Sequence, residues 1–321
     1  MTYRVASNQP PSPLGQSGSS LRYKTTRPIA GVSLLVISTW ALSCLDGSGK
    51  WSMEEGAPLL LLCWMRYVVH LALAVAIILP AKGISGLRSV RVRDQILRGV
   101  FMLASTLASF TTLHFLPQAE ATAIYFLAPL IVLAFAPWIL QEPMRISRWV
   151  AAGVGFLGVL IVIRPGSGLD VTGTICGLVT AVLVAGQSIA TRRVAVDNPY
   201  TTLVWSGLVG SVCLTFTMPF WLSSVLSAVY TLGPFQWLIL VSTGAWGALG
   251  HLLQIKAYQN APASLLAPFT YLQIIAAAAL GWFVWSQFPD AVSWLGILVI
   301  CASGLSIGLV EWRKGRKLTL A

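Results

Sequence analysis

The chain has 321 residues, of which 56% are hydrophobic and only 10% are charged. Soluble proteins use charged residues for about a quarter of their sequence, so this composition excludes a water-soluble globular protein. The apolar residues form long blocks that can cross about 30 Å of hydrocarbon as helices. The sequence therefore predicts an all-α membrane protein.

Ten apolar segments are predicted to span the bilayer, in the order 29–45, 57–79, 99–116, 120–140, 148–163, 172–191, 200–222, 235–255, 262–285 and 291–311. Residues 1–28, rich in Pro, Ser and Gly, are predicted to be a disordered tail because they cannot build a core. Residues 312–321 form a second, basic tail. The first outer loop is predicted to begin at Asp46 and to contain Lys50.

The basic residues are unevenly distributed between the two sides of the predicted bundle. If the N-terminus lies inside, all of the 21 Lys and Arg residues except Lys50, Arg66 and Arg164 fall on the cytoplasmic side. For a protein of the inner membrane, this asymmetry predicts, by the positive-inside rule, that both termini lie in the cytoplasm. It also explains the net charge of +11 without a nucleic-acid partner.

The two halves of the chain resemble each other at an offset of 145 residues, which is 287 − 142 for Glu142 and Gln287 and 294 − 149 for Trp149 and Trp294. The repeat predicts one five-helix unit at 29–166 and another at 172–311. Because five is odd, the second unit enters the membrane from the opposite side. Such an inverted repeat is a common plan of secondary transporters, although a channel or a membrane enzyme would also be compatible with a duplication.

The fifth predicted span contains Gly153, Gly155 and Gly158 at the spacing of a dinucleotide-binding fingerprint. That fingerprint works only between a strand and a helix N-terminus, whereas these glycines lie within an apolar helical segment. They are predicted instead to let neighbouring helices approach closely. The same interpretation applies to Gly244, Gly247, Gly250, Gly304 and Gly308.

Ionisable side chains inside the predicted spans are the first candidates for function. A charge at the bilayer centre costs about 2.5–3.5 kcal/mol on insertion scales, so these side chains are expected to face the bundle interior. Arg66 lies about nine residues into its span, which is a depth of roughly 13 Å. It is predicted either to form a buried ion pair with Glu120 or Asp46, or to clamp an anionic group of a substrate.

Glu120 begins the fourth predicted span, where an acid interacts favourably with the helix dipole. A proton-coupling role is the alternative for Glu120. His70 is predicted to snorkel toward a polar neighbour. For His114 and His251, structural hydrogen bonding and ligand contact both remain open.

Polar side chains of the second half offer further candidates for a cavity. His251, Gln254 and Tyr258 are spaced at i, i+3 and i+7, so they share one face if their helix continues to residue 258. For any single residue the alternative is an interhelical hydrogen bond, worth about 0.6 kcal/mol on average. The predicted substrate-binding set is Arg66, His114, Glu120, Tyr125, Gln187, His251, Gln254, Tyr258, Tyr271 and Gln273.

Catalytic and metal-binding motifs are missing from the sequence. It has no HExxH and no GxSxG motif, and its five cysteines lie singly, without metal or disulfide spacing. An enzyme is therefore not predicted, and no cofactor is expected. Glu142, beside Arg145 and Arg148 in a polar link, is expected to be structural.

Several motifs resemble those of the drug/metabolite transporter superfamily, EamA type with two repeats. They are LPQAEAT at 116–122, AP at 128–129, QEP at 141–143, RPG at 164–166, the glycine-rich fifth span, Asp46, Lys50 and Arg66-Tyr67. The resemblance covers about 29–310, and it is stronger in the first half. Family members often carry Glu at the end of the ninth span, where this chain has Gln287.

The resemblance implies a ten-helix transporter that moves a small polar or amphipathic metabolite by alternating access. Related proteins handle amino acids, nucleoside-like compounds, vitamins or opines, in either direction. The implied partners are a small-molecule substrate and the lipid bilayer, with protons as an optional coupling ion, and the protein would be a monomer or homodimer. The alternative is a membrane-embedded enzyme or an accessory subunit that transports nothing.

Overall fold

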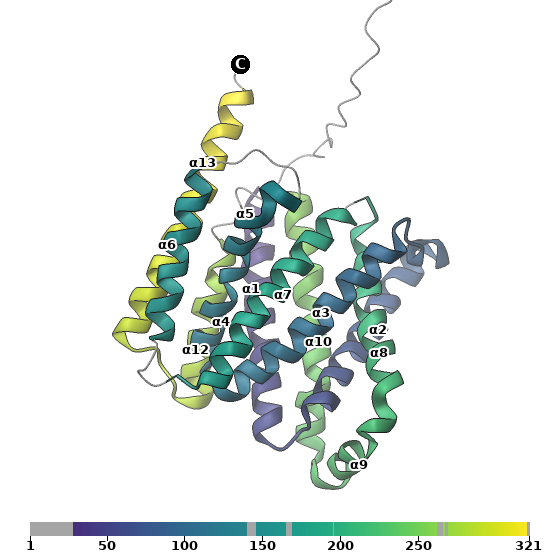
Figure 1. Ribbon diagram of the computed structural model, residues 1–321. Helices are drawn as coiled ribbons and strands as arrows, with labels where there is room; N and C mark the ends of the chain where they lie inside the picture. The colour runs from purple at the N-terminus through teal and green to yellow at the C-terminus, as the bar shows by residue number, and fades with distance from the viewer. Residues whose placement is uncertain are drawn as a thin grey trace, which may run out of the picture.

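The long apolar segments of the sequence form long α-helices (Figure 1). The computed structural model describes residues 28–139, 146–164, 169–194, 196–261, 266 and 269–319, and this part of the chain contains no β-strand. Within these described residues, six helices are long and apolar enough to cross a membrane. They are α1 (Pro28–Glu54), α2 (Leu59–Lys82), α3 (Val92–Phe115), α7 (Val171–Arg193), α8 (Pro199–Thr217) and α10 (Pro234–Asn260).

The other helices for which the structure gives bounds are α4 (Gln118–Tyr125), α5 (Leu127–Ile139), α6 (Ile146–Ile163), α9 (Leu222–Thr231), α12 (Leu272–Trp285) and α13 (Ala291–Thr319), with 3-10 turns η1 (Ile84–Leu87) and η2 (Met218–Phe220). Within the six long helices, only 33–44% of the most apolar window is buried inside the protein. The rest is an apolar outer surface suited to hydrocarbon. The prediction of an all-α membrane protein is confirmed.

The first helix does not end at Asp46, so the prediction of an outer loop beginning there is wrong. α1 continues through Lys50 to Glu54. The Ser48 hydroxyl donates a hydrogen bond to the carbonyl of Cys44 at 2.7 Å, which satisfies this polar group within the helix. The Lys50 side chain points inward and is only 3% exposed. Polar residues here face the bundle interior and do not mark the end of the helix.

Other predicted spans also differ from the observed helices. The fourth is divided into α4 and α5 at Phe126, because Pro129 lacks the N–H that would bond to the carbonyl of Tyr125. The third begins earlier than predicted, at Val92, so that Arg98 lies on the helix. The ninth is described as α12 only from Leu272, and most of its earlier part lies outside the described residues.

Some predictions fall on residues that the structure does not describe. These include the N-terminal tail up to residue 27 and the link that contains Glu142. At the other end of the chain, α13 continues to Thr319 and includes most of the predicted basic tail.

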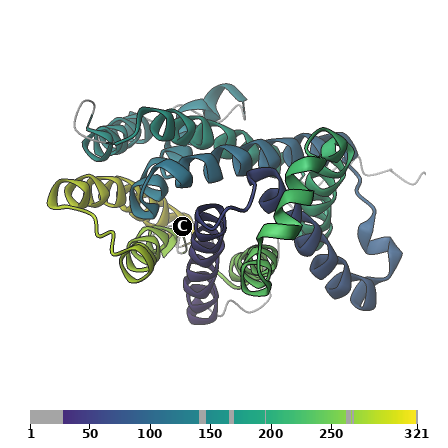
Figure 2. The ribbon, with the colours of Figure 1, turned by 90° about the horizontal axis from the view of Figure 1, so that it is seen from below.

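The two halves of the chain are interlocked. The five most extensive helix contacts are α1–α10, α3–α7, α6–α13, α2–α8 and α2–α10, and each joins a helix of the first half to one of the second. Seen from below, α1 lies between α12 and α10 (Figure 2). Residues far apart in the sequence are therefore brought together along the middle of the bundle.

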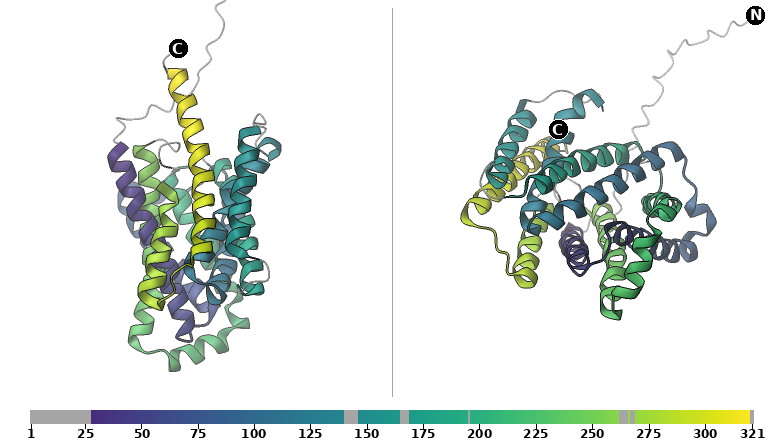
Figure 3. Two further views of the ribbon diagram at one scale, coloured as in Figure 1. Left: turned by 90° about the vertical axis from the view of Figure 1, so that its left-hand side faces the viewer. Right: turned by 60° about the horizontal axis from the view of Figure 1, so that its bottom comes forward.

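The two ends of the molecule differ in which connections they hold. α1 begins and α13 ends at the top of Figure 1, which we call the Pro28 end. α1 finishes and α13 begins at the opposite end, which we call the Glu54 end. Figure 3 shows α13 extending beyond the other helices at the Pro28 end.

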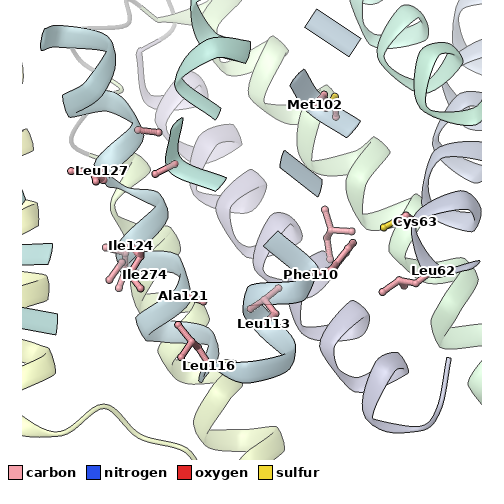
Figure 4. Close-up of a cluster of buried hydrophobic side chains, with 14 of the residues drawn as sticks. Leu62, Cys63, Met102, Phe110, Leu113, Leu116, Ala121, Ile124, Leu127 and Ile274 are labelled. Atoms are coloured by element: carbon pink, nitrogen blue, oxygen red, sulfur yellow. The ribbon is translucent and has the colours of Figure 1, made fainter. Parts of the chain in front are cut away.

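A buried apolar core fixes the helices that carry the polar interior. Its side chains come from α2, α3, α4 and α12, among other helices (Figure 4). Phe110 and Leu113 of α3 are buried, and Ile124 of α4 lies beside Ile274 of α12. This packing sets the positions of the polar residues on the same helices.

Candidate functional site

Arg66 of α2 is held in the bundle by polar and aromatic partners. Its Nη1 donates a hydrogen bond to Oγ1 of Thr106 on α3. The neighbouring Tyr67 hydroxyl donates to the carbonyl of Met102 at 2.9 Å and lies 2.8 Å from Oγ1 of Thr106. The guanidinium carbon of Arg66 lies 5.3 Å from the ring centre of Tyr67 and 5.8 Å from that of Phe110, which is within reach of cation–π attraction.

Two histidines meet beside Arg66. The rings of His70 on α2 and His251 on α10 have centroids 5.9 Å apart and cross at 71°. Nε2 of His70 lies 3.3 Å from the carbonyl of Leu203, which can only accept, so His70 donates from this nitrogen. His70 therefore reaches a polar neighbour as predicted, but that neighbour lies inside the bundle, because His70 is only 3% exposed. Nε2 of His251 is buried and has no hydrogen-bond partner within the described residues.

The backbone of α10 at Gly247 faces these groups. A Cβ atom at Gly247 would lie 3.8 Å from Nδ1 of His70 and 3.9 Å from Nε of Arg66. Asp46 on α1 attracts Arg66 electrostatically, but the two form no ion pair within the described part of the chain. We define the central site as Arg66, His70, Thr106, Phe110 and His251.

Glu120 lies elsewhere, in the first turn of α4. Its side chain is 6% exposed, and its Oε2 has no hydrogen-bond partner in the structure as described. Its charged neighbours are Lys50, Arg164 and Asp290. The ion pair between Arg66 and Glu120 that the sequence suggested is not formed, because the guanidinium turns toward α3.

Lys50 joins several elements at the Glu54 end. Its Nζ donates to the carbonyl of Leu116 at 2.9 Å and to Oε1 of Gln287 at 3.5 Å, and it lies 5.3 Å from the ring centre of Trp285. The indole of Trp285 donates to the carboxylate of Glu54. These contacts tie the end of α1 to the start of α4 and to the connection between α12 and α13.

A second tie at the same end lies outside the membrane-spanning segments. Arg164, just after α6, forms an ion pair with Asp290, just before α13. The hydrogen bond from Arg164 lowers the pKa of Asp290 well below its usual value, and the backbone N–H of Ser293 donates to the same carboxylate at 2.8 Å. The Glu54 end of the bundle is thus closed by contacts between the two halves.

The other predicted site residues are dispersed. Gln254 interacts with His251 from one turn along α10, which continues far enough to include Tyr258, yet Tyr258 is 39% exposed. His114 is exposed and lines a cavity of about 190 Å³ with Met53, Ala57, Leu59 and Thr111.

Four more of the predicted residues pack within the bundle. The hydroxyl of Tyr125 donates to the carbonyl of Ser109 at 2.8 Å. The ring of Tyr271 stacks on that of Phe126 at 4.9 Å. Gln187 of α7 and Gln273 of α12 are half-buried on their helices.

Thr106 and Phe110 are members of the central site that sequence reasoning did not single out. They lie one turn apart on α3, so both project from the same face of that helix. The third predicted span is rich in small and hydroxyl residues, which indicated close helix contacts but not which residue would meet Arg66. The composition of the span therefore indicated helix contacts in general but did not identify Thr106.

The fold and its interior define a multi-pass helical membrane protein with two interlocked halves and a polar centre. The chain belongs to the EamA-like transporter family, which matches it twice, over residues 29–164 and 171–309. Together the two matches include almost all of the described helices.

Characterised relatives of this chain are named as transporters. It is 26% identical over 276 residues to the riboflavin transporter of Brucella anthropi, covering 84% of this chain and 95% of the relative. It is 27% identical over 228 residues to the S-adenosylmethionine uptake transporter of Rickettsia prowazekii, covering 70% and 74%. It is 25% identical over 289 residues to the pseudopaline exporter CntI of Pseudomonas aeruginosa, covering 89% and 98%.

A solved crystal structure shares the fold, with a TM-score of 0.59 at 19% identity, and the match covers 88% of this chain and 98% of the other. The protein is therefore a membrane transporter of a small molecule and not an enzyme.

Proposed function

We propose that the protein is a secondary transporter of the cell inner membrane that moves a small amphipathic metabolite with an anionic group by alternating access. Both termini would lie in the cytoplasm, and ten helices would cross the membrane. The relatives named above carry a vitamin, S-adenosylmethionine and pseudopaline, and their names include both uptake and export.

The observation that supports an anionic substrate is the hydrogen bond between Arg66 and Thr106. A half-buried guanidinium bonded to a neutral hydroxyl keeps its charge uncompensated by a direct carboxylate partner. Arg offers a planar fork of donors that matches a carboxylate. The rings of Tyr67 and Phe110 beside it would contact an apolar or flat part of the same molecule.

A thermal-shift screen of the purified protein tests this proposal. Metabolite carboxylates would be compared with their methyl esters, because a ligand at 100 Kd stabilises a protein by about 2.7 kcal/mol. Arg66→Lys is expected to leave the protein folded and to weaken acid binding by about tenfold, or about 1.4 kcal/mol. The control is Arg91→Lys, since Arg91 lies in an exposed pair with Asp94, and it should bind normally. Equal binding of acids and esters to the native protein would eliminate the clamp.

Flux measured in proteoliposomes that contain only this protein separates transport from the alternative of an accessory subunit. The acids that stabilise the native protein are expected to cross the membrane. Binding without flux would support the accessory role.

A further inference from the structure

His251 carries a buried ring nitrogen for which the described residues provide no hydrogen-bond partner. Nε2 of His251 has almost no contact with solvent and no hydrogen-bond partner among the described residues. Buried polar atoms are normally paired, so an unpaired one at a candidate binding site calls for a partner that arrives with the ligand. The imidazole is also the side chain that most readily changes its charge near neutral pH.

The charged groups around His251 come from several helices. α10 packs against α1, α2 and α8. α2 contributes Arg66 and His70, and α3 contributes Arg98. The neutral groups are Gln254 on α10 itself and the Leu203 carbonyl of α8, which His70 contacts.

Carboxylates are scarce around this ring. Asp46 of α1 acts on Arg66, and none of the groups that act on His251 is an acid. A proton on His251 would therefore add a positive charge next to Arg66. That charge would be repelled in the empty site and compensated once an anion occupied it.

We propose that His251 takes a proton from solvent when a carboxylate-bearing substrate binds at Arg66, and releases that proton when the substrate leaves. This inference rests on the proposed function, because it requires the anion at Arg66. Substrate and proton then bind with positive coupling, and by linkage each raises the affinity of the protein for the other. The transporter would carry a proton together with its anion.

Benzoate is a suitable probe, because it places a carboxylate on a flat ring and stays largely ionised under mildly acidic conditions. Its affinity for the native protein in detergent would be measured between about pH 7.5 and about pH 5.5, the range in which histidines change charge. If one proton binds with each benzoate, the affinity should rise by up to about tenfold per pH unit. Proton uptake on benzoate addition in weak buffer should approach one proton per bound benzoate.

Two histidine variants test which residue takes up the proton. His251→Gln should bind benzoate no more tightly than the native protein does at about pH 7.5, and its affinity should not change with pH. His114→Gln should keep the pH dependence, because the structure places His114 outside the central site, at a separate cavity. If His251→Gln fails to fold, ¹⁵N-histidine spectra of the native protein provide a second measurement. The chain has only three histidines, so the charge state of each can be followed with and without benzoate.

The outcomes separate this inference from the proposed function. Benzoate binding that does not change with pH would overturn the proton coupling and leave the anion site standing. A pH dependence that persists in His251→Gln would overturn the assignment to His251. If methyl benzoate binds the native protein as well as benzoate does, or if benzoate does not bind, the anion site itself fails and the coupling with it.

Discussion

The hydroxyl group of Thr106 links two side chains and one backbone carbonyl. Its Oγ1 accepts from Arg66, lies beside the hydroxyl of Tyr67 and donates to the carbonyl of Met102 at 2.8 Å. A single hydrogen bond of this kind contributes about 0.5–1.5 kcal/mol net, and more when the partner is charged. The position of the Arg66 guanidinium therefore depends on the uncharged side chain of Thr106.

Thr106→Val keeps the shape of the side chain and removes the hydroxyl. We expect the affinity for benzoate to fall about five- to tenfold, which corresponds to about 1–1.4 kcal/mol, because Arg66 loses its fixed orientation. Thr111→Val is the matched control, since the Thr111 hydroxyl bonds only to the carbonyl of Leu107 in its own helix. Benzoate titrations of both variants check the prediction. Unchanged binding in Thr106→Val would show that Thr106 does not orient Arg66.

Asp197 lies in the connection between α7 and α8, and its hydrogen-bond partners define its role. Its carboxylate accepts from the hydroxyl of Ser89, from Nε2 of Gln95 at 2.9 Å and from the N–H of Val90 at 2.9 Å. Burial alone would raise the pKa of Asp197, but these hydrogen bonds outweigh it and lower the pKa below the ordinary value of about 3.9. At pH values above about 3.9, the ionised carboxylate of Asp197 therefore stabilises the folded state.

The stabilisation of the folded state by Asp197 should be lost as the pH falls below about 4 and then below the lowered pKa of the folded state, where its carboxylate becomes protonated. Asp197→Asn should lower stability by about 1–3 kcal/mol at neutral pH and should weaken the acid-dependent loss. Thermal unfolding in detergent at about pH 7 and about pH 3 measures both effects. In the control Asp170→Asn, the new side chain can still accept from the N–H of Gly173, so little change is expected. An equal loss of stability in both variants would contradict this account.

Charge patterns in the sequence identified some of these residues and not others. Arg66 could be predicted because a lone cation in an apolar run is conspicuous. Its partner could not, because Thr106 is one of several hydroxyl residues in its span and only the packing of α2 on α3 selects it. Glu120 was recognised as important, but its charged neighbours come from α1, from the residue after α6 and from the residue before α13, which no local pattern brings together.

At the scale of helices, glycines decide how closely two of them approach. α6 packs extensively on α13. A Cβ atom at Gly158 would lie 3.0 Å from the carbonyl oxygen of Gly296 and 3.0 Å from the backbone nitrogen of Ile300. One at Gly155 would lie 2.2 Å from Leu130. These two glycines allow the close contact that the sequence predicted, whereas Gly153 is exposed and a Cβ there would meet no other atom within 4 Å.

Alanine at these positions tests the distinction. Gly158→Ala should destabilise the protein by about 1–3 kcal/mol, because the atoms that it meets belong to the backbone of α13 and cannot move aside cheaply. Gly153→Ala should be neutral or stabilising by up to about 1 kcal/mol, because Ala is the better helix former. Thermal unfolding of the two variants in the same detergent makes the comparison. A loss at Gly153 equal to that at Gly158 would rule out the packing explanation.

The ends of helices were harder to predict than their existence. The apolar blocks identified the spans, but Asp46 and Lys50 were assigned to a loop because polar residues usually mark a membrane boundary. In the folded protein Lys50 finds the Leu116 carbonyl inside the bundle, so the helix has no reason to end there. Such a partner lies 66 positions away in the chain and is invisible to a local pattern.

At the scale of the whole molecule, the helix contacts follow a two-fold pattern. In order along the chain, α1, α2 and α3 of the first half correspond to α7, α8 and α10 of the second. The contact of α1 with α10 has its counterpart in that of α3 with α7, and α2–α10 has its counterpart in α3–α8. α2 packs on α8 and α6 on α13, each against its own counterpart.

Corresponding helices also run in opposite directions. α1 finishes at the Glu54 end, where Glu54 bonds to Trp285. α7 begins at that same end, because Arg164, shortly before it, pairs with Asp290. The offset of 145 residues divides the ten predicted spans into two repeats of five. Because five is odd, this division was enough to predict the inverted arrangement. The interlocking of the halves was not predicted, because sequence similarity between repeats does not say which of their helices touch.

The arrangement of charges between the two ends predicts which side of the membrane each end faces. At the Glu54 end, Lys50 and Arg164 are both engaged, with the Leu116 carbonyl and with Asp290. The loop before α3 carries Arg88 and Arg91, and the positive-inside rule places such an excess in the cytoplasm.

A fluorescent protein fused after Ala321 should therefore fluoresce, while alkaline phosphatase fused at the same position should be inactive. Phosphatase inserted after Asp170, at the Glu54 end, is the matched control and should be active. The reverse activities would place the Pro28 end outside and would remove the topology on which the proposed function depends.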